Sequence, residues 1–177
     1  MLWLFTDAAR LPDPREAIAR LPKGLCGVVL RHDGDPHRAA LGRDLARICR
    51  LRRLRLVVAG DTRLALALGA GIHLRAGTWP DVLRPGGAGR RALRTSSAHN
   101  EMETRRAARA GADVIFLSPV FPTASHPGGA ALGVVRWARL AGRGRAGVAA
   151  LGGIRDATVA RLPARKCCAI GAIAALS

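Results

Sequence analysis

Two short stretches near the end of the chain, Leu151-Gly-Gly-Ile154 and Ile170-Gly-Ala-Ile173, decide the fold class. They stand where two apolar runs end, at residues 147–151 and 167–170, and we predict both runs as strands. Their glycines let backbone amides approach a ligand closely, and a helix that begins beside them adds partial positive charge. The stretches therefore suit two roles equally: plain tight turns, or a phosphate site after the last two strands of a barrel.

The rest of the chain alternates short apolar runs with amphipathic stretches, which is typical of repeated strand–helix units. The other predicted strands cover residues 2–6, 27–31, 54–59, 71–74, 92–96 and 114–117. Helices are predicted over residues 14–21, 36–52, 63–68, 100–110, 131–141 and 156–162, with a last one beginning at the end of the chain. Strands in strict alternation with helices, and glycine turns after the last two, favour a closed barrel over an open sheet. We predict a compact (β/α)8 TIM barrel of the α/β class, as a single domain over residues 1–177.

The net charge of +17 raises the question of a nucleic-acid partner. Apart from a cluster at residues 50–55, the basic residues are spread along the chain. No aromatic residues lie among them to stack on bases. We therefore expect no nucleic-acid partner beyond loose, non-specific binding at low salt.

The distribution of apolar residues and cysteines bears on the compartment. No apolar run approaches the roughly 18 residues of a membrane span, so we expect no membrane partner. Residues 1–7 lack a basic start and predict a strand, not a signal peptide, and the expected location is the cytoplasm. Cys26 and Cys49 stand alone, and the adjacent Cys167 and Cys168 fall in the last predicted strand, where they would point to opposite faces. We expect four buried free thiols.

A third motif follows the sixth predicted strand. It runs Gly111-Ala-Asp-Val-Ile-Phe-Leu-Ser-Pro-Val-Phe-Pro-Thr123 and continues to Ser125 and His126. Its prolines stiffen the loop, and its hydroxyls could donate to an anion. Together with the later glycine pair, this segment resembles the thiamine phosphate synthase and thiazole tautomerase superfamily. Residues 64–74 and 97–99 extend the resemblance, which covers most of the chain.

The resemblance implies that a pyrimidine diphosphate is joined to a thiazole phosphate, with release of pyrophosphate and with Mg²⁺ neutralising the leaving group. Carried over residue by residue, Arg31 matches the arginine of the family's Gln-Leu-Arg-Glu-Lys motif. Ser97 matches the serine that contacts the pyrimidine diphosphate, and Thr123 and Ser125 match loop hydroxyls that hold the thiazole phosphate. The family's phosphate-binding turns are matched by Gly152, Gly153 and Gly171.

The departures from the family pattern concern the metal and the diphosphate. Asp33 stands where the motif around Arg31 has its lysine. Ala59-Gly60 stand at an Asn-Asp pair whose aspartate binds metal, and Gly77 lies near the second metal aspartate. Asp61 is the nearest carboxylate that could replace them, and one carboxylate alone holds magnesium weakly. Arg75 could instead neutralise a phosphate directly.

Three histidines are candidates for a general base, because an imidazole titrates near neutrality. The tautomerase branch uses a histidine on the loop after strand six, and Pro119 stands at that place here. We keep His126 and His99 as catalytic candidates. The alternative without a catalytic role is a solvated loop residue for His126 and the residue before a helix cap for His99. His73 has packing at a strand end as its plain role.

We expect an enzyme that binds a small phosphorylated ligand, a thiamine phosphate synthase-like transferase of thiamine biosynthesis. The alternative is a divergent thiazole-phosphate-binding or tautomerase-like barrel without synthase activity, which the lost metal carboxylates suggest. Self-association is a further hypothesis, because the truncated eighth helix leaves an apolar rim that a second copy could cover.

Overall fold

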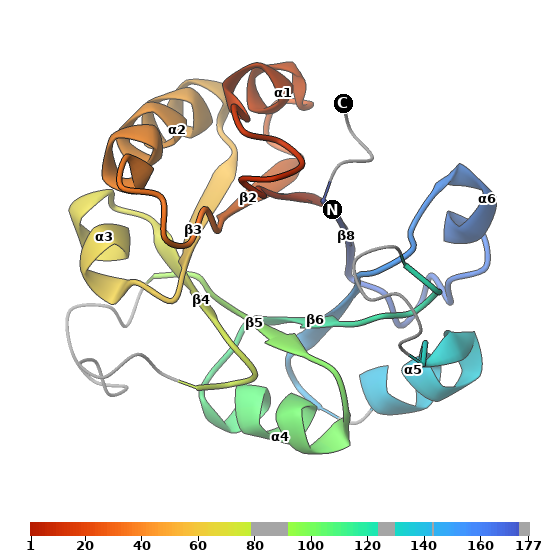
Figure 1. Ribbon diagram of the computed structural model, residues 1–177. Helices are drawn as coiled ribbons and strands as arrows, with labels where there is room; N and C mark the ends of the chain where they lie inside the picture. Colours follow the sequence, from red (N-terminus) through yellow and green to blue (C-terminus); the bar gives the residue numbers. More distant parts are fainter. Residues whose placement is uncertain (79–91, 124–129, 143, 174–177) are drawn as a thin grey trace.

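The computed structural model describes residues 1–78, 92–123, 130–142 and 144–173. Its eight strands are all parallel and close into one barrel in the order of the sequence, as predicted (Figure 1). The barrel closes where β8 pairs with β1, with Ile170 beside Leu2 and Gly171 beside Trp3. The strands are β1 (Leu2–Phe5), β2 (Cys26–Leu30), β3 (Arg55–Ala59), β4 (Gly71–Leu74), β5 (Arg94–Ala98), β6 (Val114–Leu117), β7 (Gly147–Ala150) and β8 (Ala169–Ala172).

Helices surround the ring of strands on the outside (Figure 1). They are α1 (Arg15–Arg20), α2 (Arg38–Arg52), α3 (Thr62–Ala67), α4 (Glu101–Arg109), α5 (Gly133–Ala141) and α6 (Asp156–Val159). Residues 75–89 contain two prolines and four glycines, which predicts at most one helical turn there. That segment and the start of the predicted last helix fall largely outside the described residues. Among the helices that are described, none has both the length and the apolar character needed to cross a bilayer.

The interior of the barrel is filled by a few large rings set against small residues. Phe116 meets Trp3 edge to face at 5.5 Å between ring centroids and Phe5 at 4.8 Å. A Cβ on Gly27 would lie 2.4 Å from the Trp3 ring, so only glycine fits there. Val29, Val57 and Ala149 complete this buried layer. Since side chains fill the middle of the barrel, a ligand can bind only at its ends.

Two strands lie two residues later than predicted. β5 covers Arg94–Ala98 and not residues 92–96, and β8 covers Ala169–Ala172 and not residues 167–170. The apolar pattern misleads here because β5 buries the polar Thr95 and Ser96, whose hydroxyl groups find partners inside the protein. Ser97 and Gly171 consequently lie within strands, and Gly171 is not part of a turn after β8.

The expectation of four buried thiols is correct for two. Cys26 and Cys49 are buried, whereas Cys167 is half-buried and Cys168 is exposed, and all four are free. Cys167 and Cys168 precede β8 and are not part of it. The later start of β8 is the reason, because the chain reaches the barrel wall only at Ala169.

Candidate functional site

A cavity of about 860 Å³ opens at the carboxyl ends of the strands. Its deepest residues, Phe5, Ala59 and His73, belong to the barrel interior. Most of the predicted binding residues line it, namely Arg31, Ser97, His99, Thr123, Gly152, Gly153 and Gly171. Ser125 and His126 lie outside the described residues. The topology thus brings together side chains from opposite ends of the sequence.

Arg31 is held in place by the end of β1. Its Nε donates to the backbone oxygen of Thr6 at 2.9 Å, and its Nη2 donates to Oδ2 of Asp7 at 2.5 Å. The backbone N–H of Arg31 donates to the Thr6 hydroxyl at 3.0 Å. Asp7 therefore orients the guanidinium and leaves its other N–H donors for a ligand.

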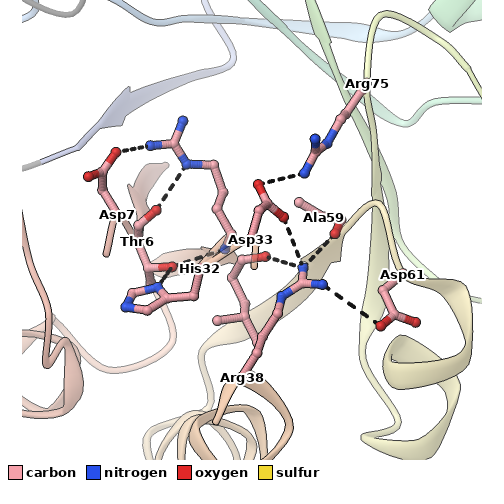
Figure 2. A network of polar contacts seen from close by, with 10 residues as sticks. Thr6, Asp7, His32, Asp33, Arg38, Ala59, Asp61 and Arg75 are labelled. Atoms are coloured by element: carbon pink, nitrogen blue, oxygen red, sulfur yellow. Dashed lines mark hydrogen bonds and ion pairs between the residues drawn. The ribbon is translucent and has the colours of Figure 1, made fainter. Parts of the chain in front are cut away.

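A second cluster joins the ends of β2, β3 and β4 (Figure 2). Asp33 forms an ion pair with Arg75 at 2.6 Å, and its other carboxylate oxygen lies 3.6 Å from Arg38. Arg38 also lies 3.8 Å from Asp61 and donates to the backbone oxygen of Ala59 at 2.6 Å. Two arginines and two aspartates thus form one chain of contacts along the rim, and we call it the rim cluster.

Arg38 is the member of the rim cluster that sequence analysis missed. It is the first residue of α2, within the helix predicted over residues 36–52, and no role was predicted for it. A cation in the first turn opposes the helix dipole, and α2 has no acidic residue in that turn. That mismatch is the signal in the sequence that could have identified Arg38.

The loop that carries Arg75 is fixed by the serines of β5. The amide of Ala76 donates to the Ser97 hydroxyl at 3.2 Å, and the amide of Gly77 donates to the Ser96 hydroxyl at 3.0 Å. A Cβ on Gly77 would lie 2.5 Å from the backbone nitrogen of Ala107 in α4. The loop is therefore pressed onto α4, and Ser97 supports it as well as lining the cavity.

The two described histidines that line the cavity have different environments. His73 is buried, and its Nδ1 lies 2.8 Å from the Thr95 hydroxyl. Burial, and after it the nearby Arg31 and Arg75, lower the pKa of His73 to about 3, so that imidazole stays neutral near pH 7. His99 is exposed, and its Nδ1 lies 3.0 Å from the backbone oxygen of Ser118. Because that oxygen can only accept, Nδ1 of neutral His99 carries the proton and Nε2 is free of one.

The glycine pair after β7 forms a tight turn against the loop after β6. Gly152 has φ of +90° and Gly153 has φ of +66°, a region that favours glycine. A Cβ on Gly152 would lie 2.8 Å from the Cα of Pro119, and one on Gly153 would lie 2.6 Å from the backbone oxygen of Pro122. Within the described part of the chain, neither glycine amide donates to a protein acceptor. Both amides are therefore available beside the cavity that these residues line.

The chain is similar to proteins of a known family. The family described as thiamine monophosphate synthase matches residues 6–176. A thiamine-phosphate synthase of Levilactobacillus brevis is 37% identical over 131 residues, which are 72% of this chain and 59% of that protein. One from Geobacillus thermodenitrificans is 38% identical over 87 residues, 49% of this chain and 39% of that protein. The alignments thus span between 39% and 59% of the length of these curated relatives.

Among solved structures, the thiamine phosphate pyrophosphorylase from Pyrococcus furiosus has a similar fold. Its TM-score is 0.78 at 22% sequence identity, and the match covers 97% of this chain and 84% of that one. At this identity the similarity supports the barrel architecture and not the roles of individual residues.

Proposed function

Since the chain belongs to the thiamine monophosphate synthase family, we propose that it is a thiamine phosphate synthase-type transferase of thiamine biosynthesis. It joins a pyrimidine diphosphate to a thiazole phosphate and releases pyrophosphate. The observation that carries the proposal is the single cavity that Arg31, Ser97, Thr123 and the Gly152-Gly153 turn all line. We infer the reaction from the names of the relatives. We infer from the cavity where the two phosphorylated substrates bind.

The two halves of the cavity offer different groups to phosphate. On one side lies the guanidinium of Arg31, whose planar N–H donors match phosphate oxygens. On the other side lies the Gly152-Gly153 turn, whose amides have no acceptor among the described residues and which packs against the loop that carries Thr123. We assign the diphosphate to the side of Arg31 and Ser97, and the single phosphate of the thiazole to the glycine turn.

His99 is the described candidate for proton transfer. Its Nδ1 donates to the backbone oxygen of Ser118, so the unprotonated Nε2 can accept a proton from a substrate in the cavity. His126 remains the second candidate. His73 suits a different task, because its lowered pKa leaves it a neutral hydrogen-bonding group at the floor of the cavity.

The proposal is tested by incubating the purified protein with both substrates and measuring thiamine phosphate. We expect product, and a loss of roughly 100-fold or more in kcat/KM for Arg31→Gln, because charge-assisted bonds to the diphosphate are lost. Arg20→Gln is the matched control, since it removes an exposed arginine that is paired with Glu16 on the outer helix α1. Absence of product under all conditions, with or without Mg²⁺, contradicts the proposal.

The second candidate is a barrel that binds thiazole phosphate without synthase activity. It is favoured by one observation: Asp33 and Asp61, the carboxylates near the expected metal positions, both lie against Arg38. This candidate predicts that thiazole phosphate raises the melting temperature while no thiamine phosphate forms. The proposed synthase predicts both stabilisation and product.

We also propose that the protein acts in the cytoplasm on small phosphorylated ligands. All four cysteines are free thiols, which a reducing compartment maintains. Self-association remains a hypothesis, and a monomer in sedimentation at micromolar concentration would count against it.

A further inference from the structure

The rim cluster lies beside the two positions at which the family resemblance implies metal-binding carboxylates, since Asp61 follows Gly60 and Arg75 stands two residues before Gly77. Gly60 stands at one of these positions, and its missing side chain leaves room for Arg75. A Cβ built on Gly60 would lie 3.3 Å from Nε of Arg75, so the guanidinium lies directly over this residue. An aspartate at position 60 would compete for the space that Arg75 fills.

The two remaining carboxylates do not fit a divalent cation. Asp33 contacts Arg75 through Oδ2 and Arg38 through Oδ1. Asp61 caps α3 by accepting from the Leu64 amide at 2.9 Å, and its other oxygen faces Arg38. Magnesium needs near-octahedral oxygen ligands at about 2.1 Å, and two guanidinium groups at the same carboxylates would repel it. Within the described residues, no group of three or more His, Cys, Asp or Glu side chains could hold a metal.

Arg38 supplies a fixed positive charge behind the cavity wall. Its side chain is only 16% exposed, and it donates to the backbone oxygen of Ala59. Its Nε is buried and has no hydrogen-bond partner among the described residues. A charge buried in this way needs compensation, and Asp33 and Asp61 provide it.

Arg75 is the arginine of the rim cluster that a ligand can reach. Its side chain is 57% exposed, it lines the cavity, and its ion pair with Asp33 is the only one described for it. Asp33, itself 48% exposed, lies between the two arginines. A ligand anion can therefore take Arg75 from Asp33, and Asp33 still keeps Arg38 as its counter-charge.

We propose that Arg75, backed by Arg38, takes the place of the divalent metal as the counter-charge for a diphosphate group. Without a ligand, the carboxylate of Asp33 pairs with Arg75. The diphosphate, which is also an anion, displaces Asp33 from Arg75 when it binds. The identity of the diphosphate as part of a pyrimidine substrate rests on the proposed function. The binding of inorganic pyrophosphate without a metal does not rest on it.

The first test is calorimetric titration of the protein with inorganic pyrophosphate in the presence of EDTA. We expect binding by the unaltered protein and an affinity about tenfold lower for Arg75→Gln, which loses charge-assisted hydrogen bonds. Asp33→Asn is expected to bind several-fold more tightly, because the competing carboxylate is gone. Arg20→Gln, which removes an exposed cation that is paired with Glu16 on α1, is expected to match the unaltered protein within about twofold.

Two results would overturn the inference. One is pyrophosphate affinity that is the same in Arg75→Gln as in the unaltered protein. The other is a decrease in affinity for Asp33→Asn, which would mean that the carboxylate helps to hold the ligand. Circular dichroism of each variant establishes that the fold is retained.

The second test titrates the protein alone with Mn²⁺ and follows the electron paramagnetic resonance signal of the free ion. We expect no bound Mn²⁺ up to about 1 mM protein and metal, because the carboxylates already have cationic partners. A stoichiometric site that Asp33→Asn or Asp61→Asn abolishes would overturn the inference. Pyrophosphate binding in EDTA without any synthase turnover would instead contradict the proposed function and leave the inference standing.

Discussion

At the residue scale, the buried hydroxyl of Thr6 holds the backbone of Arg31 and the side chain of His32 at the rim. It accepts from the backbone N–H of Arg31 at 3.0 Å and lies 2.9 Å from Nδ1 of His32. Nε2 of His32 lies 3.2 Å from the backbone oxygen of Pro12, which can only accept. Neutral His32 therefore carries its proton on Nε2, and the Thr6 hydroxyl donates to Nδ1. These hydrogen bonds hold His32, which has a positive φ of 37°, and fix the backbone of Arg31 beside it.

The environment of His73 predicts a pH dependence of stability. Its pKa is lowered to about 3 in the folded protein, first by burial and then by Arg31 and Arg75. A lowered histidine pKa means that the unfolded chain binds the proton more readily, so stability is lost as pH falls below about 6.5. Between pH 7 and pH 5 this costs about 2 kcal/mol.

We expect His73→Gln to lose about 2 kcal/mol less than the unaltered protein over that range, as measured by urea unfolding at both pH values. His37→Gln, which removes an exposed imidazole, is the control. Equal losses in the unaltered protein and His73→Gln would show that burial of His73 does not determine the acid response.

At the scale of elements, the turn after β7 and the loop after β6 form one unit. The amides of Val120 and Phe121 donate to the backbone oxygens of Leu151 and Gly152 at 3.0 and 3.1 Å. Gly153 packs against Phe121 and Pro122 in the same loop. The position of one of these two loops therefore depends on the backbone of the other.

This dependence predicts the effect of Gly153→Ala. The added Cβ would lie 2.6 Å from the backbone oxygen of Pro122, at a residue with φ of +66°. Gly24→Ala is the matched control, because Gly24 has φ of +73° and nothing lies within 4 Å of its Cβ position. We expect both variants to lose about 1–2 kcal/mol from the positive φ, and Gly153→Ala to lose more.

The measurements are urea unfolding and calorimetric titration with thiazole phosphate. Only Gly153→Ala is expected to weaken ligand binding, by roughly tenfold, because the turn must shift away from the loop. Equal stability losses and equal affinities in the two variants would show that contact with the loop is unimportant.

At the scale of the whole molecule, the charge is strongly unbalanced. The chain has 29 basic and 12 acidic side chains, giving a net charge of +17. Several of the acidic side chains are already paired within the protein, for example Asp7, Asp33 and Asp61 at the rim. Such an excess of positive charge is expected to attract the phosphates of any polyanion, whatever its sequence.

We therefore expect the protein to bind a DNA duplex at about 20 mM salt and to release it by about 200 mM. Fluorescence anisotropy with two duplexes of unrelated sequence measures this, and their salt dependences are expected to coincide. Affinity that persists at about 200 mM salt for one duplex only would point to specific recognition instead.

The sequence by itself determined the barrel and most of the candidate site. Eight strands were predicted, and all eight are present with small shifts at their ends. Local signals succeeded because they act over a few residues. Asn100, for example, stands at the start of the helix predicted over residues 100–110 and caps α4 by accepting from the Glu103 amide at 2.9 Å. The glycine pair was identified from its place after a strand, and Arg31 and Ser97 from the family resemblance. All of them line one cavity because the ends of the strands meet at one face of a barrel.

Only the tertiary structure decided which charges meet and which strand residues are buried. The partners in the rim cluster come from residues 33, 38, 61 and 75, which lie on different strand–helix units. Likewise, β5 buries Thr95 and Ser96 because neighbouring elements bond their hydroxyls. The low pKa of His73 depends on the same long-range packing. The physical reason is that ion pairing and desolvation depend on distances in space, which a local pattern of residues does not contain.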